Sequence, residues 1–181
     1  MSLEEIYKSK CDSDSDINEH LPTLKRYSEE CEHVTEMGVR WVVSTYAFMM
    51  GKPKKLVSID IESIEKHDIS VDDLTQLAKD NGVEFEFIES DTLKVVIEET
   101  DLLFLDTLHT YDQVKGELNL HSNKVKKYIV FHDTESFKDR GMNGDPIGIW
   151  VAIEEFLRDN NEWIISEKFT NNNGLTIIKR I

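Results

Sequence analysis

The sequence predicts an α/β fold with a mostly parallel sheet, helices on both faces and an antiparallel hairpin at the C-terminus. First, short apolar runs alternate with stretches of helical periodicity from residue 33 to residue 157, which is typical of parallel strand–helix units. Second, the runs 55–60, 101–106 and 127–132 have fully apolar centres, which indicates strands buried on both faces. Third, two further apolar runs flank Asn171-Asn172-Asn173-Gly174, whose residue types favour a hairpin turn.

The 181 residues fit one domain, which we place at residues 17–181. Residues 1–16 contain few groups to bury, so we expect a mobile N-terminal segment, in which residues 3–10 could form a helix. Apolar spacing and end signals such as Gly51, Ser70 and Gly82 predict the later helices. The expected helices cover 17–30, 44–50, 70–82, 111–125 and 147–157. The expected strands cover 33–37, 55–60, 83–88, 101–106, 127–132, 163–169 and 175–180.

Composition excludes several classes of function. With 36 acidic residues against 21 Lys and Arg, the net charge is −15, which disfavours binding to nucleic acid because phosphates need clustered cations. No apolar run approaches the roughly 20 residues of a membrane span, and no secretory leader is recognisable. Cys11 and Cys31 could pair, but two cysteines are more typical of free thiols in a reducing compartment. We therefore expect a soluble cytoplasmic protein.

Acidic residues follow every predicted parallel strand. Ligands of open parallel sheets bind outside the carboxyl ends of the strands, so these residues should surround one site. An acidic protein often has acidic loops, but five strand ends out of five are harder to explain in that way. The residues at these ends are Glu36 with Gly38, Asp60, Glu89 with Asp91, Asp106, and His132 with Asp133.

The first two strand ends have the spacing of a nucleoside site. Gly38 would allow a ligand to approach the backbone closely, although a simple turn glycine is the alternative. No further glycines follow it, which disfavours a pyrophosphate site and hence a nicotinamide-dependent oxidoreductase. Asp60 follows Gly38 by about 22 residues, the spacing at which a carboxylate grips a ribose diol. Asp91 would extend this row of acidic residues toward the base of the nucleoside.

The last two strand ends carry groups for metal binding and proton transfer. Asp106 and Asp133 offer carboxylate oxygens to a divalent cation such as Mg²⁺, and ligation by His132 would favour Mn²⁺. His132 could instead support the site from a second layer or the core. His109 could act as a general base, or it could only cap the helix that follows.

On these residues, the chain resembles class I S-adenosylmethionine-dependent methyltransferases over about residues 20–181. It is most similar to small metal-dependent O-methyltransferases, including those that modify sugars and antibiotics, which carry Asp-x-x-His-x-Tyr and His-Asp-Thr after the fourth and fifth strands. The resemblance implies a Rossmann-like seven-stranded sheet whose last strand inserts antiparallel between the fifth and sixth. It also implies cofactor binding by Glu36, Gly38, Ser44, Asp60, Asp91 and Asp106, metal binding by Asp106, His132 and Asp133, and catalysis by His109.

The implied activity is transfer of a methyl group from S-adenosyl-L-methionine to a hydroxyl of a small acceptor, for which a sugar is one candidate, with help from Mg²⁺ or Mn²⁺. Related enzymes often have glycines where this chain has Trp41, Val42 and Val43, so the alternative is a catalytically silent binding protein of the same fold. The loop at residues 138–146 could close over the site or be a plain surface loop. A homo-oligomer is compatible with the sequence.

Overall fold

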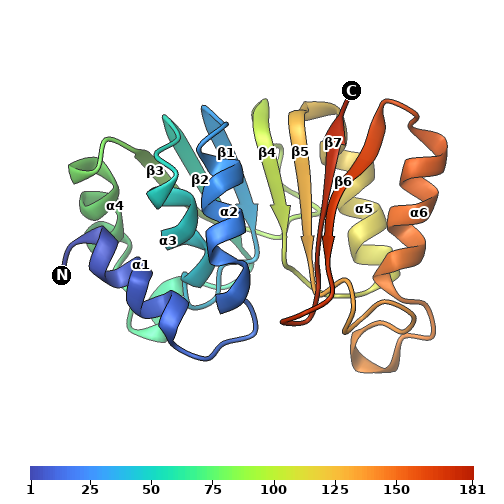
Figure 1. Ribbon diagram of the computed structural model, residues 1–181, viewed down its shortest axis with the longest axis horizontal. Coiled ribbons are helices and arrows are strands. Elements are labelled where there is room, and N and C mark those ends of the chain that lie inside the picture. The colour runs from blue at the N-terminus through green and yellow to red at the C-terminus, as the bar shows by residue number, and fades with distance from the viewer.

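A seven-stranded sheet forms the centre of the computed structural model, which describes residues 1–181 (Figure 1). The strand order is β3-β2-β1-β4-β5-β7-β6. β7 lies antiparallel between β5 and β6, whereas the other neighbours are parallel, which confirms the predicted sheet. The strands are β1 (His33–Met37), β2 (Lys55–Asp60), β3 (Glu84–Glu89), β4 (Thr100–Leu105), β5 (Val125–His132), β6 (Trp163–Phe169) and β7 (Leu175–Arg180).

Helices cover both faces of the sheet, as predicted. One face carries α1 (Leu3–Asp12), α2 (Leu21–Ser28), α3 (Val43–Met50) and α4 (Val71–Asp80). The other carries α5 (Tyr111–His121) and α6 (Ile149–Asp159). Short 3₁₀ turns lie at η1 (Asn18–His20), η2 (Ile64–His67), η3 (Ser122–Lys124) and η4 (Met142–Gly144).

Two apolar cores lie on opposite faces of the sheet. Alternate side chains of β4 enter them in turn: Leu102 and Phe104 pack under α1–α4, and Leu103 and Leu105 pack under α5 and α6. All four are buried, as expected for a strand covered on both faces. Their burial holds the end of β4, and therefore Asp106, in place.

The N-terminal region differs in part from its prediction. A single helix over residues 17–30 is wrong: η1 ends at His20, and α2 begins at Leu21. Pro22 explains the break, because proline has no N–H to donate to the preceding turn but suits the first turn of a new helix. Within residues 1–16, α1 starts with a Ser2–Glu5 capping box and buries Leu3. The mobility of this segment stays a prediction.

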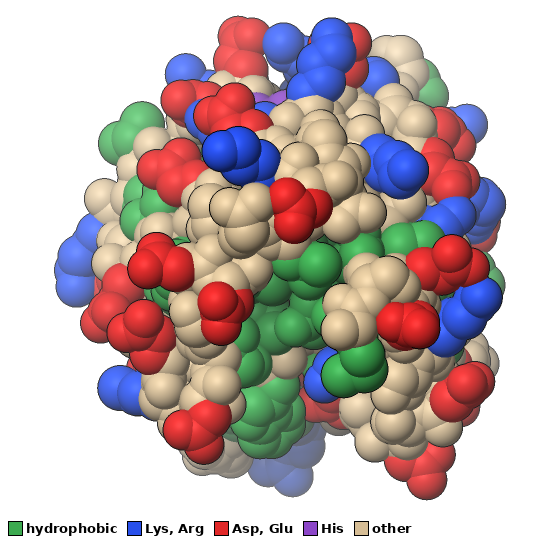
Figure 2. All heavy atoms as spheres, turned by 90° about the vertical axis from the view of Figure 1, so that its left-hand side faces the viewer, with side chains coloured by type: hydrophobic (Ala, Val, Ile, Leu, Met, Phe, Trp, Pro, Cys, Tyr) green, Lys and Arg blue, Asp and Glu red, His purple; other side chains and the backbone are tan.

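One side of the molecule shows mixed charges without a broad basic region (Figure 2). Figure 2 shows the side that lies at the left in Figure 1, where Lys and Arg are dispersed among Asp and Glu and hydrophobic atoms line a hollow. None of the helices combines the length and the apolar character that crossing a lipid bilayer requires.

Candidate functional site

A cavity of about 710 Å³ opens at the carboxyl ends of the parallel strands. The residues predicted to share one rim do so: Asp60, Asp106 and Asp133 all line this cavity. Gly38, Ser44, Asp91 and His109 line it as well, whereas Glu36 and His132 are buried outside its lining.

Gly38 lies where β1 approaches the end of β4. Its φ of +85° is a left-handed conformation, and a β carbon there would lie 1.9 Å from the carbonyl oxygen of Asp106. The Asp106 N–H donates to the carbonyl of Met37 at 2.9 Å, so the two segments are joined at this point. Glycine is therefore required both by its backbone angle and by the close approach of Asp106.

We expect Gly38→Ala to lower the free energy of unfolding by about 3 kcal/mol or more, because a backbone clash adds to left-handed strain. Gly82→Ala is the matched control: Gly82 has a φ of +79°, but nothing lies within 4 Å of a β carbon added there. That variant should lose only about 1 kcal/mol. Urea unfolding of both variants measures the difference, and equal losses would contradict the role given to Asp106.

Glu36 is a buried anchor beneath the cavity. Its carboxylate accepts hydrogen bonds from Ser44 Oγ at 2.5 Å, Thr45 Oγ1 at 2.8 Å and Ser58 Oγ at 2.6 Å. Burial raises the pKa of Glu36 to about 7, and the three hydroxyl donors oppose that rise. Glu36 thus joins β1, β2 and the start of α3, and its contact with a cofactor stays a prediction.

Asp60 and Asp91 also shape the backbone around the cavity. Asp60 Oδ2 accepts the N–H groups of Val39 at 2.7 Å and Arg40 at 3.0 Å, so the carboxylate holds the loop after β1. Asp91 accepts the N–H of Leu93 and pairs with Lys94 at 2.9 Å. Asp60 Oδ1 accepts only the N–H of Glu62 and keeps room for a hydroxyl donor from a ligand.

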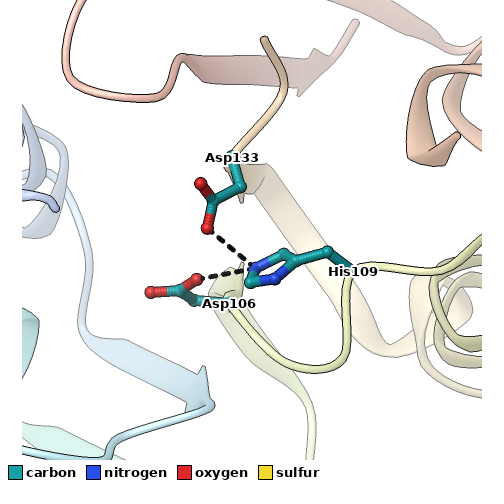
Figure 3. Close-up of side chains that lie close together, drawn as sticks. All are labelled: Asp106, His109 and Asp133. Atoms are coloured by element: carbon teal, nitrogen blue, oxygen red, sulfur yellow. Dashed lines mark hydrogen bonds and ion pairs between the residues drawn. The ribbon is translucent and has the colours of Figure 1, made fainter. Parts of the chain in front are cut away.

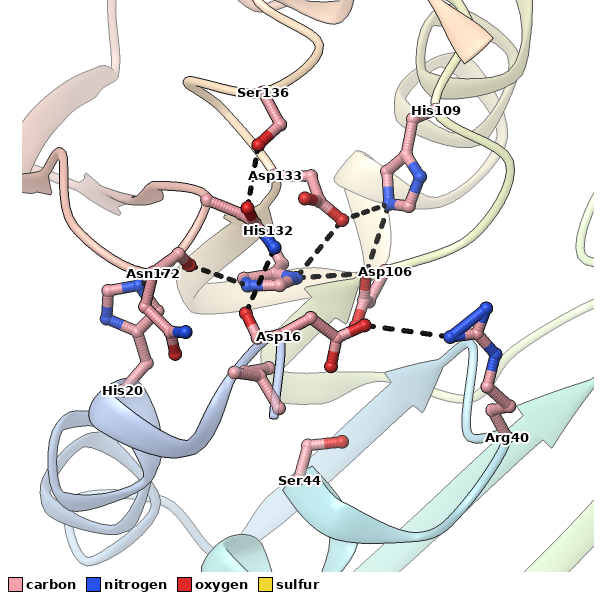
Figure 4. A network of polar contacts seen from close by, with 12 residues as sticks. Asp16, His20, Arg40, Ser44, Asp106, His109, His132, Asp133, Ser136 and Asn172 are labelled. Carbon is pink, nitrogen blue, oxygen red and sulfur yellow. Dashed lines mark hydrogen bonds and ion pairs between the residues drawn. The ribbon is translucent and has the colours of Figure 1, made fainter. Parts of the chain in front are cut away.

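Two carboxylates and two imidazoles form a closed ring of contacts at the ends of β4 and β5. His109 Nε2 lies 3.1 Å from Asp106 Oδ1 and 3.0 Å from Asp133 Oδ2 (Figure 3). On the other side, His132 Nδ1 lies 3.2 Å and 3.3 Å from the same two oxygens (Figure 4). Each imidazole therefore bridges both carboxylates. We call Asp106, His109, His132 and Asp133 the tetrad.

The surroundings of His132 favour its doubly protonated form. Its Nε2 lies 3.3 Å from the carbonyl oxygen of Asn172, which can only accept, and its Nδ1 faces two carboxylates. His20 packs edge-on against the ring and bonds the carbonyls of Asn171 and Asn172. The sequence places Asn172 only in the hairpin turn and gives His20 no role in the site, because the contacts join residues 40 and about 150 positions apart.

Contacts within the tetrad change the pKa of all four side chains. Burial alone would lower the pKa of each histidine, but the carboxylates outweigh burial and raise the pKa of His109 to about 9 and that of His132 to about 10. Conversely, burial would raise the carboxyl pKa values, but the imidazoles hold the pKa of Asp106 and of Asp133 below its usual range. Without another cation, His109 is protonated at neutral pH.

The donor set of the tetrad fits a divalent cation. Ligand atoms of Asp106, His109 and Asp133 all lie within 4.8 Å of one another. The two adjacent carboxylates need positive charge between them, and an ion that displaces the proton of His109 would supply it. One imidazole nitrogen beside two carboxylate oxygens favours Mn²⁺ or another transition metal over Mg²⁺. The set contains His109 where the sequence predicted His132, whose role as a ligand stays a prediction.

The whole cavity favours a positively charged ligand. Its lining contains six carboxylates against a single guanidinium, that of Arg40, which pairs loosely with Asp16 at 3.6 Å. Such a lining attracts a sulfonium or an ammonium and opposes a phosphate. The acidic lining residues are Asp16, Asp60, Glu62, Asp91, Asp106 and Asp133.

A second polar cluster, between α5 and the loop after β3, was missed by the sequence analysis. It contains Thr92, Thr107, Gln113 and the fully buried Glu117. The available signal was the spacing of Gln113 and Glu117, which are four residues apart and therefore share one face of a helix.

No family model matches this chain, and no curated protein does. Solved structures match over almost the full length. An O-methyltransferase from Bacillus cereus in complex with S-adenosylhomocysteine has 15% identity and a TM-score of 0.66, with 99% of this chain and 90% of that chain covered. A methyltransferase from Podospora anserina bound to the same compound has 16% identity and a TM-score of 0.64, with coverage of 99% and 87%.

A third similar structure is the O-methyltransferase TomG from Streptomyces achromogenes, involved in tomaymycin synthesis, in complex with S-adenosylmethionine. It has 13% identity and a TM-score of 0.66, and the match covers 98% of this chain and 88% of that chain. At such identities the likeness establishes a shared fold. This chain therefore has the seven-stranded Rossmann-like fold of these methyltransferases.

Proposed function

We propose that this protein is an S-adenosyl-L-methionine-dependent O-methyltransferase that acts on a hydroxyl of a small acceptor with the help of a divalent cation. The observation that carries the proposal is the tetrad, which places an imidazole between two carboxylates in the wall of an acidic cavity. The fold shared with methyltransferases supports the same conclusion.

The cavity suits a cofactor with a sulfonium. S-adenosylmethionine carries a sulfonium, an ammonium and a single carboxylate, so its net charge is positive and complements the acidic lining. Asp60, at the end of β2, would bind the ribose hydroxyls, and Gly38 would let the cofactor approach the backbone. The carboxylate of the cofactor would pair with Arg40, the one guanidinium in the cavity lining.

The loop after β1 argues against the catalytically silent alternative. Arg40 has a φ of 43° and Val42 a φ of 53°, both in the left-handed region that glycine prefers. Val42 is buried, and Asp60 binds the N–H of Arg40, so packing and hydrogen bonds maintain this course without further glycines. The side chains that replace glycine therefore leave the backbone path intact.

The proposed chemistry assigns separate tasks to the tetrad. The methyl group of a sulfonium is already activated, so the site has to align an acceptor oxygen with it and exclude water. His109 would take the proton from the acceptor hydroxyl, and its ring is held by both carboxylates and by stacking on Phe137 at 4.8 Å. His132 would keep Asp106 and Asp133 in position.

A divalent ion held by the carboxylates of Asp106 and Asp133 would lower the pKa of a bound hydroxyl and orient it, and its charge would keep His109 neutral and able to accept the proton. In that state His132, with its Nδ1 on both carboxylates, would support the ligands from behind. The identity of the acceptor as a sugar is proposed by resemblance to sugar-modifying methyltransferases.

Calorimetric titration with S-adenosylhomocysteine tests this function. We expect a dissociation constant in the micromolar range, and at least a tenfold loss in Asp60→Asn, because the amide binds a diol less well. Asp72→Asn, on the exposed first turn of α4, is the control and should bind as the wild type does. If 1 mM ligand produces no heat in the wild-type protein, the silent alternative is correct.

A further inference from the structure

Glu117 is a buried carboxylate that the proposed chemistry does not use. Its side chain is fully buried in α5, and its Oε1 accepts three hydrogen bonds: from Thr92 Oγ1 at 2.7 Å, from Thr107 Oγ1 at 2.8 Å and from Gln113 Nε2 at 2.8 Å. Its Oε2 is buried and has no hydrogen-bond partner. A group that only stabilised the fold would rarely leave a buried oxygen unpaired.

The contacts of Glu117 determine which way the amide of Gln113 points. The Gln113 atom beside Glu117 is the nitrogen, Nε2, which donates to Glu117 Oε1 at 2.8 Å. The same Nε2 also donates to Thr92 Oγ1 at 2.9 Å, so both of its N–H groups are used. No group of the protein bonds the carbonyl oxygen of Gln113, a residue that lines the cavity. Gln113 therefore presents a free acceptor to a ligand.

Two apolar side chains share this part of the cavity lining with Gln113. Leu93 and Leu108, which are 37% and 45% exposed, line it together with Thr92, Thr107 and Gln113. A β carbon on Gly116 would lie 2.8 Å from Leu93, so the absence of a side chain lets the loop after β3 pack against α5. His121 Nε2 ties the same loop through the carbonyl of Thr92 at 2.8 Å.

We propose that the carbonyl oxygen of Gln113, positioned by Glu117, accepts a hydrogen bond from the exocyclic amino group of the cofactor's adenine and so selects adenine over a 6-oxo purine. This inference rests on the proposed function. A 6-oxo group would place an acceptor against the acceptor of Gln113, and the amide cannot turn without losing its bonds to Glu117 and Thr92. Asp91, the acid that the sequence indicated for the base, accepts the N–H of Leu93 and pairs with the exposed Lys94.

The experiment compares S-adenosylhomocysteine with S-inosylhomocysteine, in which oxygen replaces the 6-amino group, by titration calorimetry. The wild-type protein should bind the adenosyl compound at least about tenfold more tightly. Gln113→Met keeps the length of the side chain without the amide and should bring the two affinities within about threefold. Glu117→Gln should reduce the preference as well, because a neutral amide at position 117 lets Gln113 turn. The matched control, Gln76→Met on the exposed surface of α4, should keep the wild-type preference.

The ratio of the two affinities distinguishes recognition of the adenine from damage to the fold, since a distorted cavity would weaken the binding of both ligands alike. If wild-type protein binds both compounds equally, or if Gln113→Met keeps the preference, the role of Gln113 is wrong while the proposed cofactor stands. If neither compound binds the wild-type protein, the proposed function fails and this inference fails with it.

Discussion

Replacing Asp106 by Asn should lower the rate of methyl transfer about 1,000-fold while the affinity for S-adenosylhomocysteine changes much less. Asp106 Oδ1 faces His109 Nε2 at 3.1 Å and His132 Nδ1 at 3.2 Å, and the amide of Asn cannot supply the negative charge that both imidazoles require. The site would lose a ligand for the cation and the orientation of its base together. Single-turnover measurements with radioactive S-adenosylmethionine give the rate, once an acceptor has been found.

The matched control for this variant is Asp112→Asn, an exposed position at the start of α5 outside the cavity lining. It should keep the wild-type rate. Excess chelator should reproduce the loss seen in Asp106→Asn without unfolding the protein. Full activity in chelator would show that methyl transfer does not need a metal. Full activity of Asp106→Asn would show that it does not need the tetrad.

The tetrad also predicts an unusual dependence of stability on pH in metal-free protein. The pKa values of His109 and His132 are raised to about 9 and about 10 from an ordinary value near 6.5, so the folded state binds these protons more tightly than the unfolded state. Their contribution is complete below about pH 6.5, and it is lost as the pH rises through 9 and 10. Tm should therefore fall by about 10 °C between pH 6.5 and pH 10.

At acidic pH the effect of the tetrad has the opposite sign, because its contribution to stability is lost as the pH falls. The pKa values of Asp106 and Asp133 are lowered, so their contribution is present above about pH 4 and is lost below it. Glu36, whose pKa is raised to about 7, adds stability that disappears between about pH 4.5 and pH 7, before the histidines titrate.

Thermal unfolding in chelator, followed by circular dichroism from pH 3 to pH 10, measures this profile. His132→Asn should flatten the decline above pH 6.5, and Mn²⁺ should oppose it because the ion takes over the charge of the protons. His67→Asn, at the half-buried end of η2 and without a hydrogen bond to the tetrad, is the control and should leave the shape of the profile unchanged. A Tm that is constant above pH 6.5 would show that the histidines are not held as ion pairs.

Much of the fold could be predicted because its signals are local. The bounds of β1, β2, β6 and β7 match the predicted residues, and the hairpin follows from Asn and Gly in a four-residue turn. The apolar spacing continues across Pro22 and therefore predicts one helix, although the proline itself signals the break between η1 and α2. Strand order had no local signal and came from the resemblance alone.

Site residues that directly follow a strand were predicted. Site residues whose role depends on contacts with distant parts of the chain were missed. Asp60, Asp106 and Asp133 share one cavity because parallel strands end on the same side of a sheet. His20 reaches its partners from a segment about 150 residues away, and Glu117 collects donors from three segments. No pattern along the chain marks such neighbours, because only the packing of the sheet and helices brings them together.

By itself, the amino-acid sequence determined the type and bounds of most elements, the acidic charge and the residues that stand at the ends of the strands. These properties depend on residue type and on periodicity over a few neighbouring positions. The tertiary structure alone decided that His109 and His132 bridge the same two carboxylates, that Glu36 lies beneath the cavity, and that Glu117 orients Gln113. Hydrogen bonds act over about 3 Å, so which groups meet depends on how the folded chain packs, not on their separation in sequence.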